Sequence, residues 1–197
     1  RCFAAYNRSP LPRTGSRARM FGALLTLLER EMPEPKVLLD VGCACGLLMS
    51  LAERRGWRCR GMEADAYGAA YARRQGLAVE CKATLPSCEF PAGSFGAIMM
   101  VDSLYYFPDP SRQLREANRL LSAGGVLLTR LPNRQGIMLA LHAMARMIPG
   151  GRERLGRWVF GHCLSDGLFT CHLRSLREMI VQAGFREVRL LPAPCTG

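Results

Sequence analysis

The residues best suited to chemistry lie between Val37 and Gly46, where an apolar stretch runs into a series of small residues. Asp40 stands near the end of the apolar stretch, and glycine or alanine occupies positions 42, 44 and 46. Small residues at a strand-to-helix turn let the backbone and its amides approach a ligand. The spacing differs from the G-x-G-x-x-G pattern that seats a pyrophosphate, and a carboxylate would repel one. This turn therefore predicts a ligand that carries an amino group or another cation.

A second acid, Glu63, is the last residue of the next β-rich run, residues 58–63. A carboxylate at the tip of the second strand of a parallel sheet can accept hydrogen bonds from both hydroxyls of a ribose. The alternative is a solvated acid at a strand end. With the acid-bearing first turn, Glu63 indicates a nucleoside ligand that lacks phosphates. A nicotinamide-dependent oxidoreductase would share the sheet but needs the other glycine spacing.

The elements that position these acids alternate between short β-rich runs and helical stretches, which predicts an α/β domain. We expect strands at 36–41, 58–63, 77–81, 95–101, 125–131 and 185–191. We expect helices at 18–31, 46–55, 66–75, 111–121, 136–147 and 173–183. This order predicts a doubly wound, mostly parallel sheet with helices on both of its faces.

Two further divisions of the chain are predicted. Residues 1–35 are expected to form a helical extension, and residues 36–197 the ligand-binding domain. Within that domain, glycines and arginines in residues 150–172 break any regular period. An excursion there would lie over the carboxyl ends of the strands, where it could cap a substrate. A surface insertion without a role is the alternative.

From Val37 to Leu191 the chain resembles the class I S-adenosylmethionine-dependent methyltransferases of the small-molecule type. Asp40 to Gly46 is similar to the first motif of that family, and Glu63 is similar to its ribose-binding acid. The other matching segments, in family order, are Ala83-Thr84-Leu85, Phe90 to Phe95, Asp102 to Pro110, Leu120 to Leu128, Leu131-Pro132-Asn133 and Ser175 to Phe185. The resemblance implies a Rossmann-like fold and S-adenosyl-L-methionine as the cofactor.

The resemblance also implies a set of cofactor-binding residues in the loops that follow the first four strands. They are Asp40, Gly42, Cys43, Ala44, Gly46, Glu63, Ala64, Thr84, Leu85, Asp102 and Ser103. Ala44 stands where the family most often has glycine, and its methyl group is tolerated if its φ is negative. The family's last antiparallel strand is expected to be missing, because only residues 192–197 follow the sixth predicted strand.

The candidates for catalysis are Asp102, Tyr106 and His172. A general base is needed only if the methyl-accepting atom is a hydroxyl of high pKa. Asp102 is the best placed of the three, since it follows the fourth predicted strand directly. Tyr106 replaces a histidine that is frequent in the family, and it could line the substrate or pack in the core. His172 lies just before the last predicted helix.

Composition excludes several classes of protein. The 197 residues are 49% hydrophobic, enough for one folded domain, and no apolar run reaches the roughly 18 residues that span a bilayer. The net charge is +11, but the arginines are scattered without interleaved aromatic residues, so we do not predict a nucleic-acid surface. The nine cysteines lack the spacing of a metal site, and they predict reduced thiols in the cytoplasm.

The sequence thus predicts a methyltransferase that acts on a small molecule or on a sugar or lipid precursor. One apolar, methionine-rich stretch, residues 136–148, is expected to be a core helix. Its alternatives are an adaptable wall for a lipid-like acceptor and peripheral contact with a membrane surface. The alternative to an enzyme is a catalytically degenerate domain of the same fold that serves as an interaction module.

Overall fold

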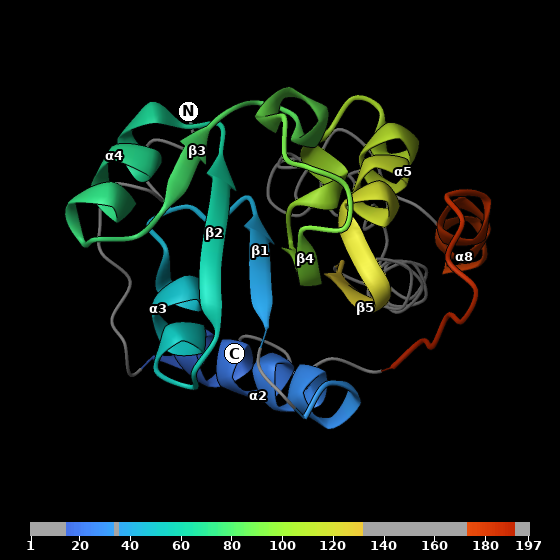
Figure 1. Cartoon of the computed structure of the whole chain (residues 1–197), viewed down its shortest axis with the longest axis horizontal. Helices are drawn as coiled ribbons and strands as arrows, with labels where there is room; N and C mark the ends of the chain where they lie inside the picture. The colour runs from blue at the N-terminus through green and yellow to red at the C-terminus, as the bar shows by residue number, and fades with distance from the viewer. Residues whose placement is uncertain (1–14, 34–35, 132–172, 192–197) are drawn as a thin grey trace, which may run out of the picture.

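A computed structural model describes residues 15–33, 36–131 and 173–191, and its centre is a five-stranded parallel sheet (Figure 1). The strands are β1 (Val37–Val41), β2 (Arg58–Glu63), β3 (Val79–Cys81), β4 (Phe95–Val101) and β5 (Leu121–Arg130). Their order across the sheet is β3-β2-β1-β4-β5, and every pairing is parallel. Successive strands are added toward one edge from β1 to β3 and toward the other edge from β4 to β5, so the strand order reverses between β1 and β4. Open α/β sheets bind their ligands at this position.

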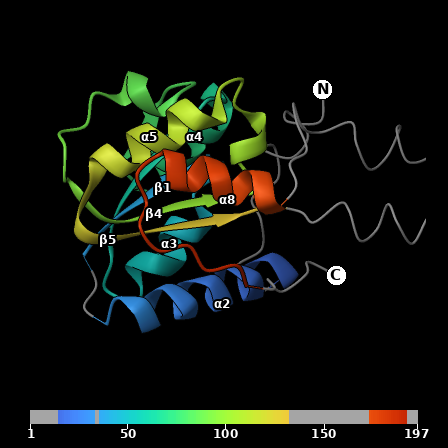
Figure 2. The same ribbon diagram turned by 90° about the vertical axis from the view of Figure 1, so that its right-hand side faces the viewer.

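Helices cover both faces of this sheet, as the sequence predicts. The helices are α2 (Ser16–Glu31), α3 (Leu47–Glu53), α4 (Ala66–Arg74), α5 (Pro110–Leu120) and α8 (Leu173–Gln182), with short 3-10 turns η1 (Leu85–Cys88) and η2 (Leu104–Tyr106). Buried side chains of α2, α3 and α4 form one apolar cluster, and those of α5 and α8 form another. Figure 2 shows α2 and α3 on one side of the sheet and α5 and α8 on the other. None of the described helices has the length and apolar character that a membrane crossing requires.

The two clusters explain why β1 and β4 are nearly continuous apolar runs. Successive side chains of a strand point to opposite faces, so Leu38 packs with α2 and α3 while Leu39 packs with α5 and α8. All residues of β4 from Phe95 to Met100 are buried. Such strands are typical of a parallel sheet covered on both sides.

One predicted strand is absent from the structure. Residues 185–191 do not form a sixth strand: Phe185 and Val188, three positions apart, pack against the same cluster, and Arg189 forms an ion pair with Glu31 of α2. Figure 2 shows this red segment leaving α8 and passing toward α2. The spacing of three does not match the two-residue period of a strand.

The fifth strand also begins earlier than predicted, at Leu121 instead of Gly125. Leu121 pairs with Phe95, whereas the next pairing joins Val126 to Ala97, so the residues between them bulge out of the ladder. The predicted helix at 136–147 and the predicted cap at 150–172 lie outside the described residues.

Candidate functional site

The carboxyl ends of β1, β2 and β4 meet at one edge of the sheet, and most of the candidate residues lie there. Val41 of β1 is in register with Met62 of β2, and Asp40 is in register with Met99 of β4. The loop after β1 (residues 42–46), the loop after β2 (residues 64–65) and the residues after β4 therefore start at the same level of the sheet.

The Glu63 carboxylate joins the first two of these loops. Its Oε2 accepts a hydrogen bond of 2.7 Å from the amide of Ala44, and its Oε1 accepts one of 2.8 Å from the amide of Asp65. The side chain is buried, with 6% of its surface exposed. Each carboxylate oxygen can accept a second hydrogen bond, so Glu63 can hold the two loops and still accept hydrogen bonds from a pair of ligand hydroxyls.

The loop after β1 uses its amides within the protein, contrary to the expectation that they point at a ligand. The amides of Gly42 and Cys43 both donate to the carbonyl of Met62, at 2.8 and 3.1 Å, and that of Gly46 donates to the carbonyl of Cys43. Burial raises the pKa of the Cys43 thiol well above its usual value, which keeps it protonated. This loop consequently offers a ligand a close, fixed surface more than it offers hydrogen-bond donors.

Glycine is required at two positions of this loop. Gly42 and Gly46 both have left-handed backbones, with φ of +82° and +81°. A Cβ at position 42 would lie 2.7 Å from the Cβ of Ser103, and one at position 46 would lie 2.2 Å from a methyl group of Leu77. The loop after β1 therefore lies in close contact with Ser103. The candidate residues of this loop and those that follow β4 are thus neighbours.

Ala44 does not meet the condition on which its methyl group was expected to be tolerated. Its φ is +49°, in the left-handed region, where a Cβ costs about 1–2 kcal/mol. The hydrogen bond from its amide to Glu63 helps to hold this conformation.

Asp40 is buried, and none of the described residues donates a hydrogen bond to its carboxyl group, but its oxygens are not fully enclosed, since they are not among the buried atoms that lack a partner. Burial, with a smaller contribution from the neighbouring Glu63 carboxylate, raises the pKa of Asp40 to about 8. A buried carboxyl group without a donor is unfavourable when ionised, so Asp40 is suited to a cationic ligand group that would restore its charge.

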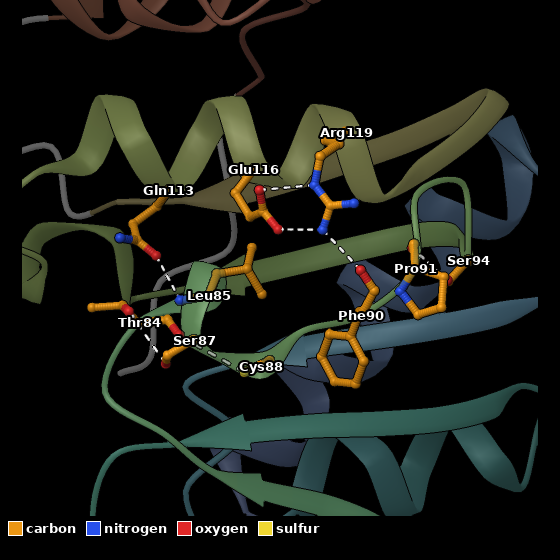
Figure 3. Close-up of polar contacts among 10 residues, drawn as sticks. All are labelled: Thr84, Leu85, Ser87, Cys88, Phe90, Pro91, Ser94, Gln113, Glu116 and Arg119. Carbon is orange, nitrogen blue, oxygen red and sulfur yellow. Dashed lines mark hydrogen bonds and ion pairs between the residues drawn. The ribbon is translucent and has the colours of Figure 1, made fainter.

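The candidate residues after β3 form hydrogen bonds with other residues of the protein (Figure 3). Leu85 is fully buried, and its amide donates to the side-chain oxygen of Gln113 at 2.8 Å. Thr84 donates to Ser87 at 3.3 Å. Gln113 was not predicted from the sequence, although its position on the same helix face as Ala117 and Leu120 was a signal that it would be buried.

A second group of polar residues surrounds Asp102 at the ends of β4 and β5. Asp102 forms an ion pair with Arg130, and its amide donates to the carbonyl of Arg130 at 3.0 Å. Burial raises the pKa of Asp102, although Arg130 and Arg17 both act to lower it. The other carboxylate oxygen, Oδ1, is buried without a hydrogen-bond partner in the described part of the chain, as is the hydroxyl of Ser103.

Of the remaining candidates, Tyr106 lies in η2 with its ring centroid 4.4 Å from that of Tyr105, and Ala64 is exposed in the loop after β2. His172 lies outside the described residues. Arg130 and Arg17 were not predicted from the sequence as site residues. The signal for Arg130 was a charged residue at the carboxyl end of an apolar strand. No group of His, Cys, Asp and Glu among the described residues has the arrangement of a metal site.

Comparisons with known proteins show the family and the fold of the chain. A family model described as a methyltransferase domain matches residues 14–190. A structure from Thermotoga maritima described as a SAM-dependent methyltransferase, possible histamine N-methyltransferase, has a TM-score of 0.63 at 23% identity and covers 89% of this chain and 73% of that one. A SAM-dependent methyltransferase from Archaeoglobus fulgidus has a TM-score of 0.59 at 14% identity, over 86% of this chain and 71% of that one. Both likenesses show the fold.

Curated relatives match a shorter part of the chain. A ubiquinone biosynthesis O-methyltransferase from Xanthomonas oryzae pv. oryzae is 33% identical over 125 residues, which is 58% of this chain and 52% of the relative. A protein with the same name from Caulobacter vibrioides is 29% identical, over 64% of this chain and 50% of the relative. The chain therefore spans about half the length of these relatives.

Replacing Ala44 by glycine is expected to stabilise the protein by about 0.5–1 kcal/mol, because it removes the left-handed strain and costs only some unfolded-chain entropy. Urea unfolding measures the change. Ala70→Gly, in the interior of α4, is the matched control and should lower stability by about 1 kcal/mol. A loss of stability in both variants would contradict the strain at Ala44.

The stability of the ligand-free protein is expected to depend on pH through Asp40. The pKa of Asp40 is 3.8 when unfolded and about 8 when folded, so between these values the folded state holds the extra proton and stability falls as pH rises. Urea unfolding at pH 5 and pH 7.5 should show a steeper loss for the wild type than for Asp40→Asn. Equal losses in the two proteins would contradict the raised pKa.

Proposed function

The chain belongs to the class I S-adenosylmethionine-dependent methyltransferases, and we propose that it transfers the methyl group of S-adenosylmethionine to a small organic acceptor. The observation that carries the proposal is the pair of buried carboxyl groups at the ends of β1 and β2. Asp40 has no donor among the described residues, and Glu63 holds the loops after β1 and β2 with hydrogen-bonding capacity to spare.

The residues present suit this cofactor. S-adenosylmethionine carries an ammonium group, a sulfonium centre and two ribose hydroxyls, but no phosphate. Asp40 would hold the ammonium group, which supplies the missing donor and positive charge. Glu63 would accept hydrogen bonds from the ribose hydroxyls through its remaining lone pairs. Gly42, Cys43, Ala44 and Gly46 would form the close surface beneath the cofactor, with Ala64, Thr84, Leu85 and Ser103 in the surrounding loops.

When bound, S-adenosylmethionine supplies a methyl group activated by a positively charged sulfur, which becomes a neutral thioether as the methyl moves to the acceptor atom. The chain's contribution is to hold the two reactants in line and to keep water out. Asp102 would receive the proton that a hydroxyl acceptor loses. Arg130 fixes one of its carboxylate oxygens and Oδ1 stays available, while burial makes the carboxylate more basic. Tyr106 would line the acceptor, and His172 stays a prediction.

An oxygen acceptor on a small molecule is the form of the reaction that we favour. The relatives that are up to 33% identical are named ubiquinone biosynthesis O-methyltransferases, which supports transfer to a hydroxyl group. A sugar or lipid precursor remains within the proposed acceptor class. We also keep a cytoplasmic location and peripheral contact with a membrane surface as proposals that rest on the sequence.

A second candidate function is a domain of the same fold that no longer catalyses the reaction and serves as an interaction module. The observation in its favour is Ala44, which strains the loop at a position where glycine would be relaxed. The two functions differ in whether the folded chain binds the cofactor and transfers its methyl group.

Calorimetry with S-adenosylhomocysteine tests the proposal. The wild type should bind it, and Glu63→Gln should bind it about 10- to 100-fold more weakly, because ribose hydroxyls lose a charged acceptor. Glu80→Gln is the matched control, since Glu80 lies on the neighbouring strand β3 in a largely exposed ion pair with Arg60 and should not affect binding. Absence of binding by the folded wild-type chain would overturn the proposed function.

A further inference from the structure

Three successive residues of β2 contact the loop after β1. The carbonyl of Met62 accepts hydrogen bonds from two amides of this loop, and the Glu63 carboxylate accepts one from Ala44. The third contact is at Gly61, where Sγ of Cys43 lies in the space that a side chain would otherwise occupy. The last turn of β2 therefore holds the loop through a carboxylate, a carbonyl and a missing side chain.

The space beside Gly61 is filled by two sulfur atoms. A Cβ at position 61 would lie 2.7 Å from Sγ of Cys43 and 2.6 Å from Sδ of Met49 in α3. It would also lie 3.1 Å from a methyl group of Val79, the residue of β3 that is in register with Gly61. Contacts under 3.0 Å are essentially never made by real Cβ atoms, so an alanine here would force a neighbour to shift.

The backbone gives no other reason for a glycine at this position. Gly61 is not among the described glycines with a positive φ, and it is in regular register with Asp40 of β1 and Val79 of β3. An alanine would therefore adopt the same backbone conformation without strain. A glycine inside a strand often marks the close approach of another segment, and here that segment is the loop after β1.

Of the two residues that carry these sulfur atoms, Cys43 is the one that would pass a displacement to the loop. Its Sγ is bonded directly to Cβ, and its backbone lies between two left-handed residues, so the thiol has little freedom to move alone. Met49 has an unbranched side chain with several rotatable bonds, so its sulfur can shift without moving α3. A side chain at position 61 would therefore push Cys43 away from β2, and the amide of Ala44 away from Glu63.

We propose that Gly61 sets the position of the loop after β1, because its missing side chain lets Cys43 lie against β2 and lets Ala44 reach Glu63. Gly61 is thus a positioning residue for S-adenosylmethionine that acts through the Cys43 thiol. The inference rests on the proposed function, since it concerns the cofactor of that site. It also gives the Cys43 thiol a role of its own, which is to fix the height of the loop above β2.

Calorimetry of S-adenosylhomocysteine binding to the full chain tests the inference. Gly61→Ala should bind about tenfold more weakly than the wild type, because the displaced loop no longer fits the ligand. Gly96→Ala is the matched control: a Cβ there would lie 2.7 Å from the Cβ of Lys36, but at the amino end of β4, away from the loop. Both variants should lose stability in urea unfolding, and only Gly61→Ala should lose affinity.

Cys43→Ala provides a second test, because it removes the sulfur atom that the new methyl group would meet. Adding Gly61→Ala to this variant should weaken S-adenosylhomocysteine binding by less than about twofold, against about tenfold in the wild-type background. This difference would not arise if Gly61→Ala acted only by lowering stability.

Amide exchange measured by NMR on the ligand-free protein gives a readout that does not depend on binding. Gly61→Ala should speed the exchange of the Ala44 amide by at least about tenfold, because its hydrogen bond to Glu63 is weakened. The amide of Asp65, which donates to the other oxygen of the same carboxylate, should change little.

Equal affinity of Gly61→Ala and the wild type would overturn the inference, as would an equal loss of affinity in Gly96→Ala. A tenfold loss that persists in the Cys43→Ala background would overturn the role of the thiol. Unchanged exchange of the Ala44 amide would overturn the displacement of the loop. Failure of the wild type to bind S-adenosylhomocysteine is a separate result that removes the proposed function, and the amide exchange then still decides whether Gly61 positions the loop.

Discussion

The hydrogen bonds that the Glu63 carboxylate accepts from Ala44 and Asp65 are the interaction on which the rest of the site depends. They tie the loop after β1 to the loop after β2, and so they fix the edge of the sheet where a ligand would lie. A carboxylate that accepts backbone amides is a strong, oriented anchor, because charged hydrogen bonds are roughly twice as strong as neutral ones. The strained backbone of Ala44 is held in place by the same anchor.

Burial, and to a smaller extent the Glu63 carboxylate, raises the pKa of Asp40. Glu63 and Asp40 lie close enough for their charges to oppose each other, and burial removes the water that would otherwise stabilise the Asp40 carboxylate. The pair is thus arranged for a ligand that brings positive charge and hydroxyl groups together. In the ligand-free protein the raised pKa keeps Asp40 mostly protonated at pH 7, and a cationic ligand group would favour loss of this proton. On the other side of β1, at the ends of β4 and β5, Asp102 is paired with Arg130.

Most strands and the positions of the two acids could be predicted from the sequence, because they depend on patterns within short segments of the chain. The runs Val37–Val41 and Phe95–Val101 are buried on both faces, and nearly continuous apolar character marks such strands. The run Arg58–Glu63 is less apolar, because Arg58 and Arg60 are exposed. The placement of Asp40 and Glu63 at neighbouring strand tips follows from the parallel order alone. What could not be predicted depends on contacts between distant residues. Residues 185–191 have strand-like composition, yet the ion pair of Arg189 with Glu31 and the packing of Phe185 keep them out of the sheet.

The side-chain partners within the site could not be predicted from the sequence for the same reason. Nothing near Asp102 in the sequence indicates that Arg130, 28 positions later, pairs with it, since the pairing follows from the register of β4 and β5. The sign of φ at Ala44 is likewise set by the hydrogen bond to Glu63, 19 positions away.

The central claim is that Asp40 is protonated in the ligand-free protein and ionises when a cationic ligand group binds. The number of protons released on binding tests this claim most directly. Calorimetry of S-adenosylhomocysteine binding at pH 7, repeated in buffers of different ionisation enthalpy, counts them. With a pKa of about 8, Asp40 is mostly protonated beforehand, so binding should release close to one proton in the wild type and markedly less in Asp40→Asn. Tight binding with no proton released by the wild type would contradict the account.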